Sequence, residues 1–129
     1  MRHFQALFML LVAVGCQAGE GEVTVQDRAV GYILTELDGA AFTGRATIFF
    51  PSEDRVTGQA PCNRYFATLT AQPPAFALTR IGSTRRACRD LDLERNFLAA
   101  LTAMTRIERS GDTLTLSNDA GRRMVFVAP

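Results

Sequence analysis

The stretch RATIFFPSEDRVTGQ, residues 45–59, decides the fold. Small or apolar residues recur in it at every second position, at Ala46, Ile48 and Phe50. This period is typical of a β-strand with one buried face. Pro51 cannot donate a backbone hydrogen bond to a ladder, and Asp54 favours a turn, so the first strand ends between them. A second strand is expected over residues 55–59.

Further short strands are expected on both sides of this stretch. They cover residues 32–37, residues 63–70, the region of Phe76 and Leu78, the region of Leu114 and Leu116, and residues 124–127. Asp38-Gly39 and Gly111-Asp112 are dipeptides typical of hairpin turns. About seven short strands at this spacing indicate a small sandwich or barrel.

One helix is expected near residues 90–104. Its apolar residues form a single stripe at helical spacing: Leu93, Phe97, Ala100, Leu101 and Met104. Asp90 is a plausible N-cap. Asp92 and Glu94 place negative charge in the first turn, where the helix dipole favours it. We interpret both carboxylates as helix-start charges and not as an acid/base pair.

The aromatic residues of the strands and the helix are expected to build the core. They are Phe49, Phe50, Phe66, Phe76, Phe97 and Phe126. An apolar slot between sheet and helix is the alternative use of some of them.

The first 15 residues have the pattern of a secretory leader. Arg2 and His3 form a short basic start, and an apolar run over residues 4–14 follows. The run is too short to span a bilayer, which takes about 20 residues. It ends in small residues directly before Cys16, as in a bacterial lipobox, so residues 1–15 are expected to be a lipoprotein signal peptide with Cys16 lipidated. The alternative is ordinary cleavage after Gly15 or Ala18.

Residues 16–29 are polar and contain glycine, so a flexible tether is expected there, followed by one domain over residues 30–129. Removal of Arg2 with the leader leaves the arginines equal in number to the 13 acidic residues. A chain of zero net charge argues against general nucleic-acid binding, which depends on neutralising phosphates. We expect no nucleic-acid partner and a membrane contact through the lipid anchor.

The chain contains three cysteines. With Cys16 assigned to lipid, Cys62 and Cys88 remain as a pair in an oxidising compartment, where a disulfide is expected. Two buried free thiols are the alternative.

The remaining residue types limit the chemistry. His3 is the single histidine and is lost with the leader, which removes the imidazole of the usual Ser-His-Asp and Cys-His mechanisms. Two cysteines are too few for an all-thiolate zinc site. We therefore expect no enzyme, no metal and no cofactor.

A cluster of arginines surrounds Cys88 in the sequence. Its arginines are Arg80, Arg85, Arg86 and Arg89, and a disulfide would add Arg64. Arg64 and Arg85, with the polar pair Asn63 and Thr84, are candidate residues for binding an anion, because arginine offers paired donors. The alternative is a solvated rim paired with Asp90 and Asp92, with Asn63 and Thr84 satisfying backbone groups near the disulfide.

Five blocks of sequence occur together in one order. The two most specific are Gly58-Gln59-Ala60-Pro61-Cys62-Asn63-Arg64-Tyr65-Phe66 and Ser83-Thr84-Arg85-Arg86-Ala87-Cys88. The others are Tyr32, Leu34 and Gly39 at the start, Glu94, Phe97 and Leu101 on the helix, and the hairpin 111–116. In these blocks the chain resembles the META domain family, the HslJ-like group of small bacterial lipoproteins (DUF306).

The resemblance implies a mainly β (α+β) fold, a small antiparallel sheet like a cracked barrel with one helix. It also implies a non-catalytic lipoprotein that binds or supports the envelope under stress. The alternatives are a carrier of an apolar ligand or lipid, and a pilot lipoprotein for a secretion or outer-membrane complex. An envelope protein or an apolar ligand is the expected partner. Gln17, in place of the Asp that retains some lipoproteins in the inner membrane, favours the outer membrane facing the periplasm.

Overall fold

The computed structural model describes Gly15 and residues 30–129. The expected leader and tether, Cys16 included, lie outside these residues apart from Gly15. The elements in chain order are β1 (Tyr32–Leu37), β2 (Ala40–Ala41), β3 (Thr47–Ser52), β4 (Arg55–Gln59), β5 (Arg64–Leu69), β6 (Leu78–Ser83), α1 (Leu91–Ala103), β7 (Arg106–Ser110), β8 (Thr113–Ser117) and β9 (Arg123–Val127).

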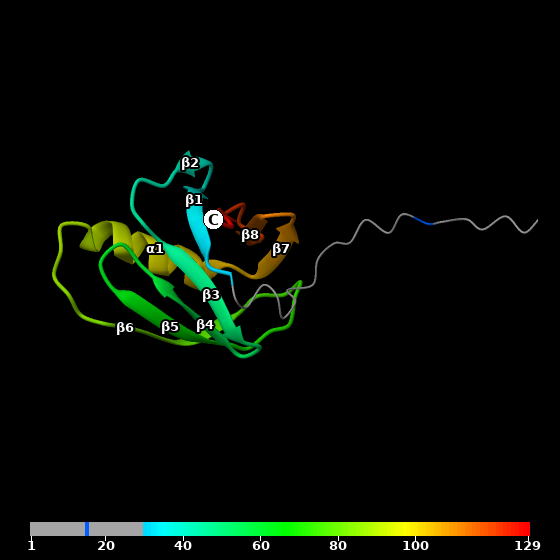
Figure 1. Cartoon of the computed structure of the whole chain (residues 1–129), viewed down its shortest axis with the longest axis horizontal. Helices are drawn as coiled ribbons and strands as arrows, with labels where there is room; N and C mark the ends of the chain where they lie inside the picture. The colour runs from blue at the N-terminus through cyan, green and yellow to red at the C-terminus, as the bar shows by residue number, and fades with distance from the viewer. Residues whose placement is uncertain (1–14, 16–29) are drawn as a thin grey trace, which may run out of the picture.

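The strands form one antiparallel sheet, and the single helix of the described chain packs against it. The sheet order is β6-β5-β4-β3-β1-β9-β8-β7, with the short β2 paired to β1. In Figure 1, α1 lies behind β3 and β4, and β7 and β8 lie on the other side of β1. The mainly β architecture with one helix is confirmed. Two strands, β2 and β7, were not expected from the sequence pattern, and β6 begins where the strand around Phe76 and Leu78 was expected to end.

The sheet is open, so the barrel that the strand spacing indicated is corrected, whereas the likeness to a cracked barrel stands. Its two edge strands are β6 and β7. In the described part of the chain they approach each other through the segment before β6, where the Phe76 N–H donates to the Thr105 carbonyl at 2.9 Å and the Ile107 N–H to the Pro74 carbonyl at 2.9 Å. Pro73 and Pro74 have no N–H to extend this ladder, so the contact stays short.

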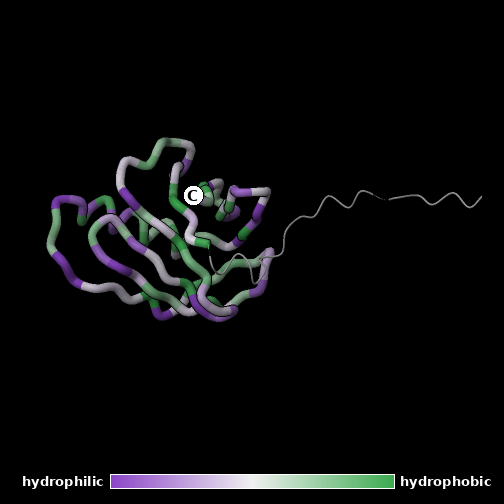
Figure 2. The backbone as a smooth tube through the Cα atoms, in the orientation of Figure 1, coloured by the Kyte–Doolittle hydropathy of each residue, from purple (hydrophilic) through white to green (hydrophobic). Residues whose placement is uncertain are grey.

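The core lies between the inner face of the sheet and α1. Tyr32 and Leu34 of β1 and Ile48 and Phe50 of β3 are buried, as their alternation predicts. Phe97 of α1 is fully buried. Its ring packs edge-on against Tyr65 at a centroid distance of 5.5 Å. Figure 2 shows the same alternation as hydrophobic and hydrophilic colours that change along the strands.

In the part of the chain that the structure describes, no helix is both long enough and apolar enough to cross a membrane.

Candidate functional site

The two cysteine blocks meet at one end of the sheet. Cys62 and Cys88 form the expected disulfide, with Cα atoms 6.0 Å apart. It joins the turn between β4 and β5 to the loop that leads into α1. The two blocks that carry the family resemblance are therefore neighbours in space although 26 residues separate their cysteines.

Asn63, beside the disulfide, uses all its polar groups within the chain. Its Oδ1 accepts from the Arg86 backbone N–H at 2.6 Å and from the Thr84 hydroxyl at 3.1 Å. Its Nδ2 donates to Glu94 Oε2 at 2.7 Å and to the Arg86 carbonyl at 3.3 Å. Thr84 Oγ1 also accepts the Arg64 backbone N–H at 3.2 Å. Asn63 and Thr84 thus hold the 84–86 loop against the start of β5, as the backbone-satisfying alternative expected.

Glu94 is the residue whose role the sequence analysis missed. It is 5 % exposed and accepts the backbone N–H groups of Cys62 and Asn63 at Oε1. Glu94 lies in the first turn of α1, as expected, but its carboxylate turns inward and binds the β4–β5 turn, which the interpretation as a helix-start charge did not include. A signal was present in the sequence: position 94 is one residue from Leu93 and three from Phe97, next to the apolar stripe. Asp92, by contrast, is exposed and pairs with Arg95 at 2.7 Å.

The arginines of the candidate set lie on the surface. Arg64 and Arg85 are exposed, as are Arg86 and Arg89. Because Asp92 pairs with Arg95, it does not serve the basic loop as its partner. The structure therefore brings Asn63, Thr84 and Arg64 together and leaves Arg85 on the adjoining exposed loop.

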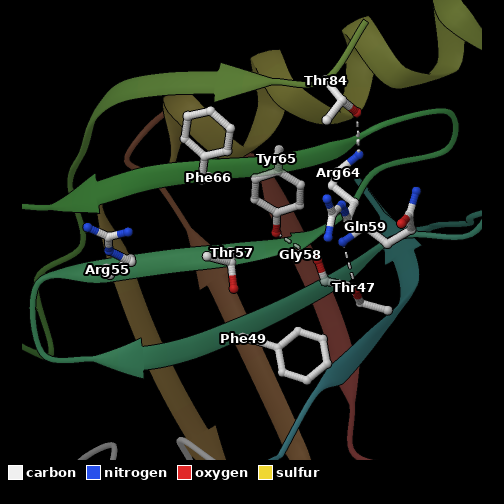
Figure 3. Close-up of a pocket in the computed structure, with 10 residues that line it drawn as sticks. All are labelled: Thr47, Phe49, Arg55, Thr57, Gly58, Gln59, Arg64, Tyr65, Phe66 and Thr84. Atoms are coloured by element: carbon white, nitrogen blue, oxygen red, sulfur yellow. Dashed lines mark hydrogen bonds between the residues drawn. The ribbon is translucent and has the colours of Figure 1, made fainter. Parts of the chain in front are cut away.

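A groove runs over the outer face of β3, β4 and β5, with a volume of about 550 Å³. We call it the aromatic groove; its lining is Thr47, Phe49, Arg55, Thr57, Gly58, Gln59, Arg64, Tyr65, Phe66 and Thr84. Figure 3 shows the Phe49 and Phe66 rings on opposite sides of Thr57, with Arg55 and Arg64 at opposite ends.

Strand register places the two rings of the groove. Thr57 of β4 is the partner of Phe49 on β3 and of Phe66 on β5. Each ring covers a glycine on the side away from Thr57. The Phe49 ring covers Gly31, directly before β1, and the Phe66 ring covers Gly82 in β6. A β-carbon on Gly31 would overlap the Phe49 ring, and one on Gly82 would overlap the Phe66 ring. Aromatic rings commonly cover such glycines in sheets. Here this packing leaves the aromatic groove open between the two rings.

Phe49 and Phe66 were expected in the core, and this expectation is wrong. They are 38 % and 50 % exposed. The reason is the strand period: their neighbours in sequence, Ile48 and Phe50 around the first and Tyr65 and Ala67 around the second, already face inward. The other four phenylalanines of the expected core are not exposed.

Hydrogen-bond donors dominate the polar lining of the groove. It contains two guanidinium groups and no carboxylate, whereas its hydroxyl and amide groups can both donate and accept. The Tyr65 hydroxyl contributes little to the donors that the groove offers, because it donates to the Thr47 carbonyl at 2.7 Å. Burial also raises the pKa of Tyr65 well above the usual range. Asp54 lies in the turn beyond Arg55; a hydrogen bond from Ser52, and more weakly the charge of Arg55, lower the pKa of its carboxyl group.

A second, smaller groove of about 370 Å³ lies between the β1–β2 hairpin and α1. Arg122 lines it and is paired with Asp38 at 3.0 Å. Ala41 and Ala99 are among its exposed residues.

Among residues 30–129 and Gly15, no group of three or more His, Cys, Asp and Glu side chains is arranged to hold a metal ion.

The fold and the site define a class of protein: an open, mainly β (α+β) sheet with one helix in the described residues. A disulfide cross-links the end of the sheet where Asn63, Thr84 and Glu94 form their hydrogen bonds. The META domain model matches residues 24–129. The chain therefore belongs to the META domain family. The META domain family is not a known enzyme family.

Solved structures share the fold at low identity. A protein from Burkholderia xenovorans, solved by NMR, is 19 % identical with a TM-score of 0.63, and the match covers 95 % of this chain and 99 % of that one. A second NMR structure is 17 % identical with a TM-score of 0.61, covering 79 % of this chain and 91 % of that one. A DUF4847 family protein from Bacteroides vulgatus is 15 % identical with a TM-score of 0.54, covering 64 % and 57 %. No curated protein matches the chain.

Proposed function

We propose that this protein is a non-catalytic lipoprotein of the bacterial cell envelope, which supports envelope integrity by binding another envelope component through the aromatic groove. The leader pattern over residues 1–15 and Cys16 support the export and the lipid anchor. Membership of the META family supports a role without a defined reaction. The outer membrane, facing the periplasm, is the proposed location.

The observation that carries the proposal is the exposure of Phe49 and Phe66 on one outward face. Both rings lie between guanidinium groups, Arg55 at one end and Arg64 at the other. Contiguous exposed apolar side chains mark interaction sites. Aromatic residues and arginine are also the types enriched at binding surfaces and at their energetic hot spots.

The carrier of an apolar ligand is the weaker proposal. It would use a slot between sheet and helix, but the helix residues that face the sheet fill that space. Phe97, Ala100 and Leu101 are each fully buried in the core. A bound component therefore has its best site on the surface.

A complementation experiment tests the role of the groove. The gene is deleted, and envelope permeability and survival under heat are measured with the wild type or Phe49→Ser/Phe66→Ser supplied in trans. We expect the double variant to accumulate normally and to fail in complementation. The matched control, Ala41→Ser/Ala99→Ser in the second groove, should complement fully.

Two results would count against the proposal. If the deletion changes neither permeability nor survival, the role in envelope integrity is wrong. If the double variant complements as well as the control, the groove is not the binding surface. The anchor is tested separately by mass spectrometry of the N-terminal peptide, where diacylglycerol on Cys16 is expected in the wild type and is lost in Cys16→Ser.

A further inference from the structure

We infer that the face with the aromatic groove docks on the membrane surface, against anionic lipid headgroups. The inference rests on the proposed lipid anchor and names the component that the groove meets. Three observations lead to it: where the exposed apolar residues lie, what charge accompanies them, and where the anchored segment enters the domain.

The exposed large apolar side chains of the described residues all lie on one side of the sheet. They are Ile33, Phe49 and Phe66, which are 39 %, 38 % and 50 % exposed. Ile33 points outward, because Tyr32 and Leu34 on either side of it are buried. Its register partner on β3 is Thr47, two residues before Phe49 and on the same face. The three side chains therefore form one outward patch over β1, β3 and β5.

The charged side chains that line the groove are all positive, although the mature chain is neutral and Glu53 and Asp54 lie in the turn beside Arg55. Arg55 and Arg64 line the groove, and the lining holds no carboxylate. Their attachment points are about 13 Å apart along the strands, since Arg64 is the partner of Gln59, four residues after Arg55. Arg85 and Arg86, both exposed, extend the charge beyond Thr84. Arginine beside exposed aromatic and aliphatic residues is typical of surfaces that lie in the headgroup region of anionic membranes.

The anchored segment enters the domain beside this patch. Gly31 lies under the Phe49 ring, so tightly that a β-carbon there would overlap it. The segment between Cys16 and Gly31 would span about 20 Å if it were the tether expected from the sequence, since a random coil of about 14 residues has that typical end-to-end distance. A lipid at Cys16 therefore keeps the Phe49 side of the domain close to the membrane. Headgroup phosphates then have Arg55 and Arg64 as partners, and the two rings reach the acyl boundary.

Site-specific fluorescence on the lipidated full chain tests the docking. An environment-sensitive dye is attached at Thr68→Cys, which is two residues from Phe66 and opposite Arg55, and the protein is placed in nanodiscs. One set contains phosphatidylcholine alone and the other adds phosphatidylglycerol. The matched control is the dye at Thr102→Cys, on the exposed side of α1.

We expect blue-shifted emission and protection from acrylamide at position 68 in the anionic nanodiscs, with no change at position 102. Added salt should weaken the effect. Phe49→Ser/Phe66→Ser and, separately, Arg55→Gln/Arg64→Gln should each abolish the blue shift. All four substituted side chains are exposed. Loss of the shift in the arginine variant does not depend on whether the phenylalanine variant has a folding defect.

The outcomes separate this inference from the proposed function. Identical emission from positions 68 and 102 in both nanodiscs overturns the docking. A change at position 68 that appears only when envelope proteins are added also overturns it, while leaving the groove a protein-binding surface. A wild-type chain that carries no diacylglycerol on Cys16, shown by mass spectrometry of the same sample, overturns the anchor on which the inference rests.

Discussion

Glu94 and Asn63 are joined through both oxygens of the carboxylate. Oε1 accepts the backbone N–H of Asn63 at 2.7 Å, and Oε2 accepts its side-chain amide at 2.7 Å. Oε1 also accepts the Cys62 N–H at 3.1 Å. Glu94 and Asn63 are 5 % and 3 % exposed, so water does not compete for these groups. This contact fixes the first turn of α1 on the turn that holds the disulfide and starts β5.

Replacing Glu94 is therefore expected to destabilise the domain. In Glu94→Gln the side-chain amide places a donor where the native structure has an acceptor, and at least one buried N–H loses its partner. Hydrogen bonds to a buried charged group are worth about 1.5–3 kcal/mol each, so we expect the free energy of unfolding to fall by about 2–4 kcal/mol. Urea denaturation followed by circular dichroism measures it.

Asp92→Asn is the matched control for Glu94→Gln. Asp92 lies in the same helical turn, but its side chain is 92 % exposed and pairs only with Arg95. Exposed pairs of this spacing contribute about 0.3–0.5 kcal/mol. If the two substitutions change the urea midpoint equally, the buried network is not what stabilises this end of the fold.

The role of Glu94 shows where the sequence stops being informative. The helix near residues 90–104 was predicted correctly from its apolar stripe, because helical period is a local signal. An acidic residue in a first turn has a sufficient local explanation in the helix dipole. Its position next to the apolar stripe indicates that it faces inward, but its partners, Cys62 and Asn63, lie more than 30 residues away, and no local pattern identifies them.

The groove was missed for a related reason. Alternation assigned Phe49 to the face opposite Ile48 and Phe50, but whether a second layer covers that face depends on the whole topology. The structure has a single helix in its described part, and that helix covers the inner face. The disulfide, by contrast, was predictable, because cysteine count and compartment constrain it without any geometry.

The disulfide is expected to stabilise the domain substantially. Cys62 and Cys88 are 26 residues apart, and closing a loop of that size contributes about 3–4 kcal/mol in the chain-entropy model. Cys62→Ala/Cys88→Ala should lower the free energy of unfolding by this amount. Thermal unfolding of the variant and of the oxidised and reduced wild type measures it.

A mass measurement controls for the redox state. The oxidised wild type should be lighter than the reduced protein by about two daltons, and the double variant should show no difference. Two cysteines that react with an alkylating reagent in the unreduced, folded wild type would contradict the pairing.

Gly58 is expected to tolerate no larger residue. A β-carbon there would overlap the Thr47 carbonyl oxygen and contact the Tyr65 ring at 2.7 Å. That carbonyl is the acceptor for the buried Tyr65 hydroxyl. Gly58→Ala must therefore move backbone or a buried ring, and overpacking of this kind costs about 1–3 kcal/mol. Urea denaturation checks the value.

Gly82→Ala is the control for Gly58→Ala. Its β-carbon would overlap only the ring of Phe66, which is half exposed and can turn away. We expect a loss below about 1 kcal/mol, in the range of ordinary surface substitutions. Equal losses for the two variants would mean that the strand backbone, and not the buried neighbours of Gly58, sets the cost.

The Asp38–Arg122 pair is expected to give a small pH dependence. The pKa of Asp38 is lowered, first by the hydrogen bond from the Arg122 side chain and then by the Arg123 backbone N–H. A carboxyl group with a lowered pKa in the folded state adds stability above its unfolded pKa, and this stability is lost as the pH falls through the folded pKa. The side chain of Asp38 is 42 % exposed, so solvent screens the pair and the contribution should stay below about 1 kcal/mol.

Asp38→Asn isolates this contribution without straining the turn. Asp38 has a φ of 52°, which asparagine also adopts readily, and its amide oxygen can still accept the Arg123 N–H. We expect the wild type to have the higher urea midpoint near pH 7 and the difference to shrink as the pH falls below 3.8, the unperturbed pKa, and through the lower pKa of the folded state. Arg122→Gln should remove the larger share of this pH-dependent part and leave the share due to the Arg123 backbone N–H. A difference between wild type and Asp38→Asn that persists unchanged to low pH would show that the turn geometry, and not the ion pair, is responsible.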